Sequence, residues 1–212
     1  MLPQRCLVCG ALGPQICACC LAALPRLAGP RCERCGAPTA WPVRRCAECT
    51  GRRLAFASAR AAVEYDAAVK ALVSGWKEHG LRRLVRVAAA LVVEVVPCPA
   101  GALSFVPPDG DRRLKRGHHT AERLARELGR RWELPVEPLL VRTRALPRQR
   151  GLGLAERRRN VRGAFRARSA PREVCVVDDV YTSGATANAA ASALRAAGAR
   201  RVTVVTFARA VR

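Results

Sequence analysis

The sequence predicts an α/β protein, a doubly wound parallel sheet preceded by a small cysteine-rich domain. From residue 54 onward, strand-like segments alternate with segments of helical periodicity, which is typical of this fold class. Nine of the eleven cysteines lie before residue 50. Near the C-terminus, an apolar strand leads through a short polar turn into a helix. We therefore expect two domains, over residues 1–53 and 54–212.

The cysteine-rich domain contains four Cys-x-x-Cys pairs within fifty residues. The pairs are Cys6/Cys9, Cys17/Cys20, Cys32/Cys35 and Cys46/Cys49. Two thiolates from one tight turn can bind a tetrahedral Zn²⁺, and a second pair closes the site. A segment this short cannot bury a sufficient core by itself, so metal binding would stabilise its fold. The eight thiolates predict two structural zinc sites.

Two details of these sites stay open at the level of sequence. Sequential pairing would group the first two pairs around one ion and the last two around another, but interleaved pairing is also compatible with the spacing. Cys19 is a ninth thiol and could replace Cys17 or Cys20 as a ligand. A redox role for the pairs is less compatible with four repeats.

The first half of the α/β domain is interpreted from its periodicity and its helix-breaking residues. Residues 54–65 are β-prone and predict one or two strands. A helix follows over 66–76, where Val69, Leu72 and Val73 recur at helical spacing. A second helix over 81–96 ends at Pro97, because proline cannot continue a helix. Residues 103–106 predict a short buried strand, followed by a basic loop over 107–117.

The second half continues the alternation. The expected helices cover residues 118–132 and 185–197, the second one capped by Gly198. The expected strands cover residues 135–141, 173–177 and 202–207. Between them, residues 142–168 carry ten arginines against one acid, Glu156. Such a run is usually a solvated face, but its density also suits binding of nucleic acid or pyrophosphate.

The net charge of the chain indicates which classes of partner it could bind. There are 38 basic and 16 acidic residues, giving a formal net charge of +22, and all but three of the basic residues are arginine. Such a charge favours polyanions such as nucleic acid, phosphorylated metabolites or acidic lipid, although codon bias also enriches arginine. No stretch approaches the roughly 18 apolar residues of a spanning helix. Residues 1–5 are followed at once by cysteines, which leaves no room for a signal peptide. We expect a cytoplasmic protein without membrane insertion.

The most informative segment is the strand, turn and helix over residues 174–186. The strand carries Asp178 and Asp179 to its carboxyl end, where ligands bind in open α/β sheets. The turn that follows opens a helix, whose free N–H groups and dipole favour phosphate. Its hydroxyl groups and its glycine are supplied by Thr182, Ser183, Gly184 and Thr186. An acidic pair beside a phosphate turn suits a ribose 5-phosphate, because carboxylates accept hydrogen bonds from sugar hydroxyls.

This segment resembles the phosphoribosyl pyrophosphate (PRPP) signature of type I phosphoribosyltransferases. Three further stretches, together with the cysteine-rich head, resemble the ComF competence-protein family. They are Lys77 with Gly80–Arg83; Val106-Pro107 with Arg113, Arg116 and Gly117; and Arg142, Arg144, Gln149, Leu152, Arg157, Arg158, Asn160, Gly163 and Phe165. One departure is His118-His119-Thr120, where the family usually has Phe-Asn-Gln. The likeness spans nearly the whole chain and implies a fold of the type I phosphoribosyltransferase kind.

The resemblance implies a role for each matched residue. Asp178 and Asp179 would hold the ribose 2- and 3-hydroxyls, with Mg²⁺ as a cofactor. The 5-phosphate would lie in the turn formed by Thr182, Ser183, Gly184, Ala185 and Thr186. Arg112 and Arg113 would face the pyrophosphate, and no catalytic residue is assigned.

The resemblance also implies a function. The expected protein binds PRPP or a related sugar phosphate and takes part in handling single-stranded DNA, together with DNA-uptake proteins, during natural transformation. The alternative is an active phosphoribosyltransferase, a glycosyltransferase that displaces pyrophosphate with an unidentified acceptor. The two interpretations share one site and differ in whether turnover occurs.

Overall fold

The computed structural model describes residues 4–108, 119–143 and 163–211. The helices are α1 (Ala18–Ala22), α2 (Ala67–Lys77), α3 (Leu84–Val95), α5 (Thr120–Trp132) and α7 (Ala185–Ala196). The strands are β1 (Ser58–Glu64), β2 (Ala102–Phe105), β3 (Val141–Arg142), β4 (Phe165–Arg166), β5 (Glu173–Tyr181) and β6 (Arg201–Arg209).

The central sheet has the order β1-β6-β5-β2, and its neighbouring strands are all parallel. Val136 extends it by a single parallel bridge to Leu103 of β2. Strands β3 and β4 form a separate antiparallel pair. Because the four main strands run the same way, their carboxyl ends lie along one edge, where ligands of such sheets bind.

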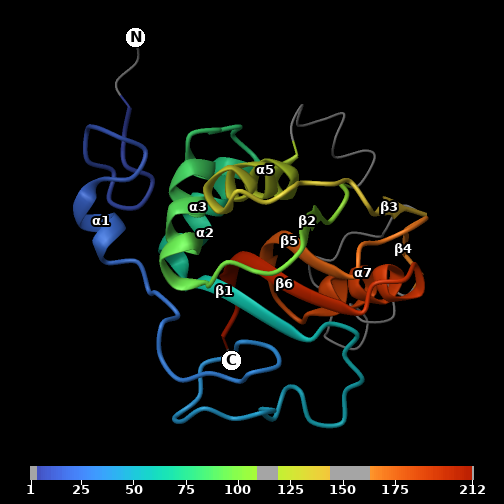
Figure 1. Cartoon of the computed structure of the whole chain (residues 1–212). Coiled ribbons are helices and arrows are strands. Elements are labelled where there is room, and N and C mark those ends of the chain that lie inside the picture. The colour runs from blue at the N-terminus through green and yellow to red at the C-terminus, as the bar shows by residue number, and fades with distance from the viewer. Residues whose placement is uncertain (1–3, 109–118, 144–162, 212) are drawn as a thin grey trace.

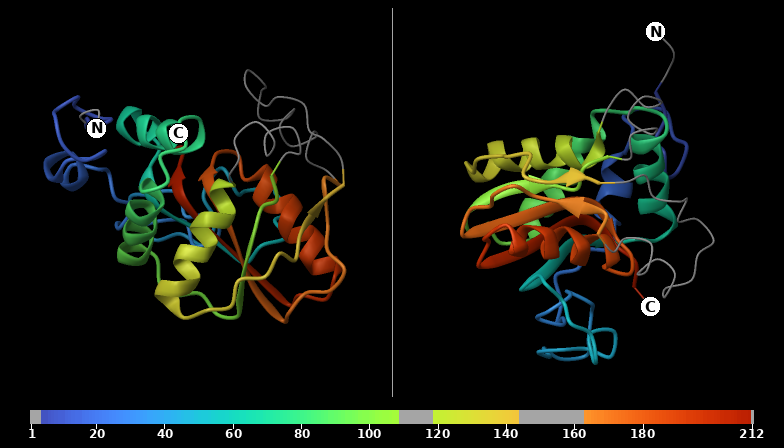
Figure 2. Two further views of the ribbon diagram at one scale, coloured as in Figure 1. Left: turned by 90° about the horizontal axis from the view of Figure 1, so that it is seen from above. Right: turned by 90° about the vertical axis from the view of Figure 1, so that its right-hand side faces the viewer.

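Helices cover both faces of the sheet (Figures 1 and 2). Along β5, Cys175 and Val177 pack into a core shared with α2, α3 and α5. Val174 and Val176 pack into a second core shared with α7. This alternation is the period-2 pattern of a strand buried on both faces. The predicted α/β class, a parallel sheet with flanking helices, is confirmed.

Two elements differ from the sequence prediction. Strand β5 continues through Tyr181 rather than ending at Val177, because its pairing with β6 extends to the Tyr181–Arg209 register. The acidic pair is therefore part of the strand. Residues 135–141 do not form a full strand; they contribute the bridge at Val136 and the start of β3.

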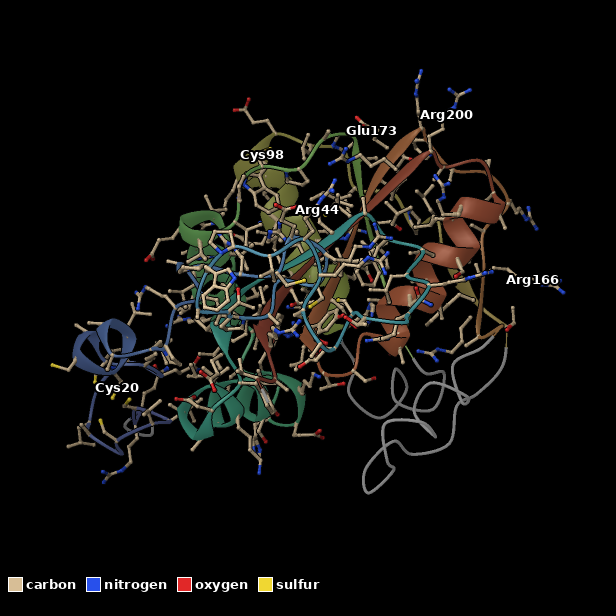
Figure 3. All side chains as sticks on the ribbon, turned by 90° about the horizontal axis from the view of Figure 1, so that it is seen from below. Cys20, Arg44, Cys98, Arg166, Glu173 and Arg200 are labelled. Atoms are coloured by element: carbon tan, nitrogen blue, oxygen red, sulfur yellow. The ribbon has the colours of Figure 1, made fainter. Side chains whose placement is uncertain are left out.

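The two cysteine modules contact opposite faces of the sheet. The first module, residues 4–24, packs on the α2 and α3 side, and a Cβ at Gly75 would lie only 2.6 Å from Leu7 Cδ1. Arg26, just beyond this module, forms a 2.6 Å ion pair with Glu94 of α3. The second module, residues 30–53, shares the core on the α7 side. In Figure 3, Arg44 of the second module lies over the centre of the molecule, and Cys20 of the first lies at its margin.

Within the described part of the chain, no helix combines the length and hydropathy needed to cross a bilayer.

Candidate functional site

The turn between β5 and α7 is built around Gly184. This residue has a φ of 70°, and an ideal Cβ at this position would lie 2.2 Å from Tyr181 Oη. Any other side chain would be strained in its backbone and would also collide with the tyrosine. The Ala185 N–H donates to Ser183 Oγ at 3.3 Å, which closes the turn. Because α7 begins at Ala185, the turn presents the first N–H groups of a helix, which have no intrahelical acceptors.

Asp179 is fixed by groups from two helices. Its Oδ1 lies 2.7 Å from Lys77 Nζ at the end of α2, and its Oδ2 accepts a 2.8 Å hydrogen bond from Thr120 Oγ1 at the start of α5. The Asp179 side chain is 11% exposed. Burial alone would raise the pKa of this carboxyl, but Lys77 and Thr120 outweigh it and hold the pKa below its usual value. Burial would likewise lower the pKa of Lys77, whereas the charge of Asp179 holds that pKa above its usual value.

Asp178 lies in a different electrostatic environment. Its Oδ1 accepts a 2.9 Å hydrogen bond from the Asp179 N–H. Burial, and then the neighbouring Asp179 charge, raise its pKa to about 7, although Lys77 and Arg142 act in the opposite direction. Two adjacent carboxylates thus share one nearby ammonium, and the second charge is poorly compensated. A hydroxyl donor or a cation bound beside Asp178 would relieve this deficit.

Arg142 connects β3 to the segment that leads away from β2. Its Nε and Nη2 donate to the carbonyl oxygens of Pro108 and Pro107, at 3.2 and 3.0 Å. Its guanidinium lies 5.0 Å from the centre of the Phe165 ring in β4. Arg142 therefore holds the start of the predicted pyrophosphate loop against the β3–β4 pair.

The structure brings together the predicted residues of the strand and the turn: Asp178, Asp179, Thr182, Ser183, Gly184, Ala185 and Thr186. Arg112 and Arg113 lie outside the described residues. Sequence reasoning missed that Lys77 and Thr120 are the partners of Asp179. The resemblance to the ComF family had drawn attention to both residues. Lys77 lies in one of the matching stretches, and Thr120 lies in the stretch that departs from the family pattern.

The eight predicted zinc ligands form two Cys₄ groups with sequential pairing. The groups are Cys6, Cys9, Cys17 and Cys20, and Cys32, Cys35, Cys46 and Cys49, and within each group the ligand atoms lie within 4.8 Å of one another. Cys19 is exposed and stands outside the first group.

The sulfur positions fit tetrahedral zinc. A Zn–S distance of about 2.3 Å places tetrahedral sulfurs about 3.8 Å apart. The sulfurs of Cys9 and Cys17 are 3.8 Å apart, and those of Cys35 and Cys46 are 3.5 Å apart. Backbone N–H groups, first that of Cys9, lower the pKa of Cys6 to about 6, whereas a hydrogen bond with Cys17 raises the pKa of Cys20 in the same group to about 12. Both groups are compatible with structural zinc, which would link their turns and stabilise the modules.

The second cysteine module contacts the β5–α7 turn directly. Arg52 Nη2 donates to the Ser183 carbonyl oxygen at 3.0 Å. Arg209, at the end of β6 and 1% exposed, donates to the Cys35 carbonyl oxygen at 2.7 Å and to Glu48 at 2.9 Å. The same guanidinium lies 4.7 Å from the centre of the Tyr181 ring, the ring that closes on Gly184. The module, the strand end and the turn therefore form one packed unit.

A parallel α/β sheet with an acidic pair before a glycine turn, joined to two Cys₄ groups compatible with zinc, defines an α/β protein with a cysteine-rich N-terminal part. It is 27% identical over 196 residues to Competence protein F of Haemophilus influenzae (strain ATCC 51907 / DSM 11121 / KW20 / Rd), and the match covers 85% of each chain. The chain is thus similar to the ComF competence proteins, as its motifs predict. No family model matches the chain. The crystal structure of TT1426 from Thermus thermophilus is similar to it over 60% of this chain and 83% of its own, with 20% identity and a TM-score of 0.36.

Proposed function

We propose that the protein binds PRPP or a related sugar phosphate at the β5–α7 turn and acts in handling single-stranded DNA during DNA uptake. The observation that carries the first part is the position of Asp178 and Asp179 near the carboxyl end of β5, shortly before a helix-opening turn. The second part is supported by the similarity to Competence protein F and by the net charge of +22.

The proposed residue roles follow from the contacts. Both oxygens of Asp179 already contact Lys77 and Thr120, so this acid mainly fixes the geometry of the site. Within the described residues, Asp178 Oδ2 has no hydrogen-bond partner, so Asp178 is the acid best placed to bind a ribose hydroxyl. The amides and hydroxyls of residues 182–186 would hold the 5-phosphate. Arg112 and Arg113 are proposed to face the pyrophosphate.

Magnesium would accompany the diphosphate. Carboxylate oxygens are ligands that Mg²⁺ prefers, and Asp178 could hold the ion together with the phosphates. The ion would neutralise charge on the diphosphate, and it would compensate the second carboxylate of the acidic pair.

A titration with PRPP, with and without Mg²⁺, tests the sugar-phosphate site. We expect Mg²⁺–PRPP to raise the melting temperature, and Thr186→Val to weaken its binding about 10-fold, because one hydrogen bond to a charged phosphate is lost. The matched control is Thr203→Val on β6, an isosteric change whose hydroxyl lies within the sheet. An unchanged melting temperature for the unaltered protein, or equal affinity of the two variants, would contradict the proposal.

The alternative function is turnover at the same site. PRPP carries its own leaving group, and pyrophosphate departure develops charge that Mg²⁺ and arginines stabilise. Release of pyrophosphate in the presence of a panel of nucleobases and oligonucleotides would favour an active phosphoribosyltransferase. Binding of PRPP without any release across the panel would favour the binding role.

A further inference from the structure

A groove with a volume of about 730 Å³ lies between α3 and α5, which pack side by side on one face of the sheet (Figure 1). Its lining is dominated by six arginines: Arg82, Arg83, Arg86, Arg123, Arg126 and Arg130. The acids that line it are Glu122 and Glu127. The groove is distinct from the turn that carries the proposed sugar-phosphate site.

The two acids neutralise only part of this charge. Glu122 pairs with Arg126 at 2.8 Å, and Glu127 pairs with Arg130 and with Arg131 outside the groove. The other four groove arginines, Arg82, Arg83, Arg86 and Arg123, have no carboxylate partner among the described residues. The groove therefore presents several uncompensated guanidinium groups to solvent.

Two of the groove arginines, Arg83 and Arg86, lie near the N-terminus of α3, where positive charge is electrostatically unfavourable. Arg83 is the N-cap of α3, Arg86 lies in its first turn, and no acidic residue occupies that turn. Positive charge near a helix N-terminus interacts unfavourably with the helix dipole. A bound anion would reverse this penalty, because both the dipole and the guanidinium groups would then face negative charge.

The geometry of the groove matches an extended anion better than a small one. Arg123, Arg126 and Arg130 recur at three- and four-residue spacing along α5, so they span about 10 Å on one face. Arg86 of α3, together with Arg82 and Arg83 just before that helix, lines the same groove. Planar guanidinium groups bind phosphate oxygens in pairs, and successive phosphates of a strand would meet successive arginines.

The proposed role in handling single-stranded DNA points to a single strand as the occupant of the groove. Apart from His119, no aromatic side chain lines the groove in the described residues, so stacking on bases has little part. His119 precedes Thr120, the partner of Asp179, so the groove begins beside the acidic pair.

We propose that this arginine groove binds the phosphodiester backbone of single-stranded nucleic acid, with little preference for base sequence. The proposal rests on the DNA-handling half of the proposed function and assigns it a surface.

The test compares two triple variants with equal charge change. The groove variant carries Arg82→Gln, Arg86→Gln and Arg123→Gln. The control carries Arg168→Gln, Arg172→Gln and Arg200→Gln, which are exposed and lie outside the groove; Figure 3 shows Arg200 extending into solvent. Binding of a fluorescent 20-nucleotide oligo-dT is measured by anisotropy between 50 and 200 mM salt.

The groove variant is expected to bind about 10- to 100-fold more weakly than the control at 0.1 M salt. Its slope of log affinity against log salt should fall by about 2, because each lost phosphate contact removes about 0.7. Equal affinities of the two variants would overturn the groove proposal while leaving DNA binding intact. Absence of binding by the unaltered protein would instead overturn the DNA half of the proposed function.

Two further measurements distinguish phosphodiester recognition from general charge attraction and from loss of folding. Poly-glutamate of equal charge should compete much less well than oligo-dT, and equal competition would overturn recognition of phosphodiester. The Mg²⁺–PRPP melting shift should be the same in the groove variant and the unaltered protein, which also verifies folding. If the triple variant is unfolded, the single change Arg82→Gln, at an exposed position before α3, is compared with Arg200→Gln by the same criterion.

Discussion

Lys77 and Asp179 form an ion pair between the end of α2 and the end of β5. The ammonium is 26% exposed and the carboxylate 11%, so both charges have lost much of their hydration. A pair of this kind contributes little net stability, but removing one partner leaves the other buried without compensation. Its main effect is to fix one acid of the pair in its ionised form.

Replacing Lys77 by methionine should lower the free energy of unfolding by about 2–4 kcal/mol, because Asp179 would then be buried without a cation. Lys70→Met, at an exposed position on the same helix, should change it by less than about 0.5 kcal/mol. Urea unfolding at pH 7 measures both. Adding Asp179→Asn to Lys77→Met should restore part of the loss, and a strictly additive double variant would contradict the pairing.

The pKa of Asp179 is lowered in the folded protein, whereas that of Asp178 is raised. Asp178 therefore makes the free energy of unfolding fall as the pH rises. Its pKa is raised from 3.8 to about 7, so the folded state binds this proton more tightly than the unfolded state. The favourable contribution is complete below about pH 4 and is lost as the pH rises to 7. Asp178→Asn should therefore gain stability relative to the unaltered protein between pH 4 and 8, by about 2 kcal/mol after allowance for partial exposure. Urea unfolding of the ligand-free proteins at both pH values measures this, and parallel pH profiles would contradict it.

At the scale of elements, the β5–α7 turn is constrained by groups from three parts of the chain. Gly184 closes against Tyr181, the Tyr181 ring lies against Arg209, and Ser183 accepts a hydrogen bond from Arg52. The turn is therefore held from the strand, from the next strand and from the cysteine module. A turn held in this way has little freedom to reorganise, so its amides would be preorganised for the proposed phosphate.

Gly184→Ala should destabilise the protein by about 2 kcal/mol or more and abolish the Mg²⁺–PRPP melting shift. The left-handed backbone accounts for about 1 kcal/mol, and the collision with Tyr181 adds to it. The matched control is Gly163→Ala, where φ is +65° but nothing lies within 4 Å of the added Cβ. It should show only the backbone effect and keep the melting shift. Equal behaviour of the two variants in urea unfolding and in PRPP titration would refute the role of the turn.

At the scale of the whole molecule, the two Cys₄ modules differ in what they support. The first lies against α2 and α3, through Leu7 and the nearby Arg26–Glu94 pair. The second shares a core with α7, contacts the β5–α7 turn through Arg52, and is linked to Tyr181 by Arg209 of β6. Loss of metal from the second module should therefore reach the proposed sugar-phosphate site, whereas loss from the first should not.

This difference is tested with Cys9→Ser and Cys46→Ser, which each remove one ligand. Metal analysis should find about two zinc ions in the unaltered protein and about one in each variant. Only Cys46→Ser should weaken Mg²⁺–PRPP binding, because it loosens the supports of Ser183 and Tyr181. Equal weakening by both substitutions, or none by either, would contradict the asymmetry.

Local patterns in the sequence predicted the α/β class and the eight candidate zinc ligands, whereas the grouping of the four cysteine pairs into two sites was visible only in the structure. Paired thiols at close spacing must share a site wherever the chain leads, and a run such as Val174–Val177 is buried in any α/β sheet. The exact end of β5 was not predictable from local pattern, because its pairing with β6 carries the strand past the two acids. The partners of Asp179 were also missed, since Lys77 and Thr120 reach it only through the packing of α2 and α5 on the sheet.

The hydrogen bond from Arg209 to the Cys35 carbonyl oxygen joins residues that are 174 positions apart. The ribosome therefore makes the second module early and its β6 partner late. At about 5–20 residues per second, the ribosome adds Arg209 roughly 9–35 s after Cys35. The emerging cysteines can take up metal long before the surface on which they finally rest exists. Docking of that module on the sheet is consequently a late, non-local step of folding. A nascent chain truncated before Arg209 would carry a cysteine module that could bind metal but would lack the β6 residue that holds it to the sheet.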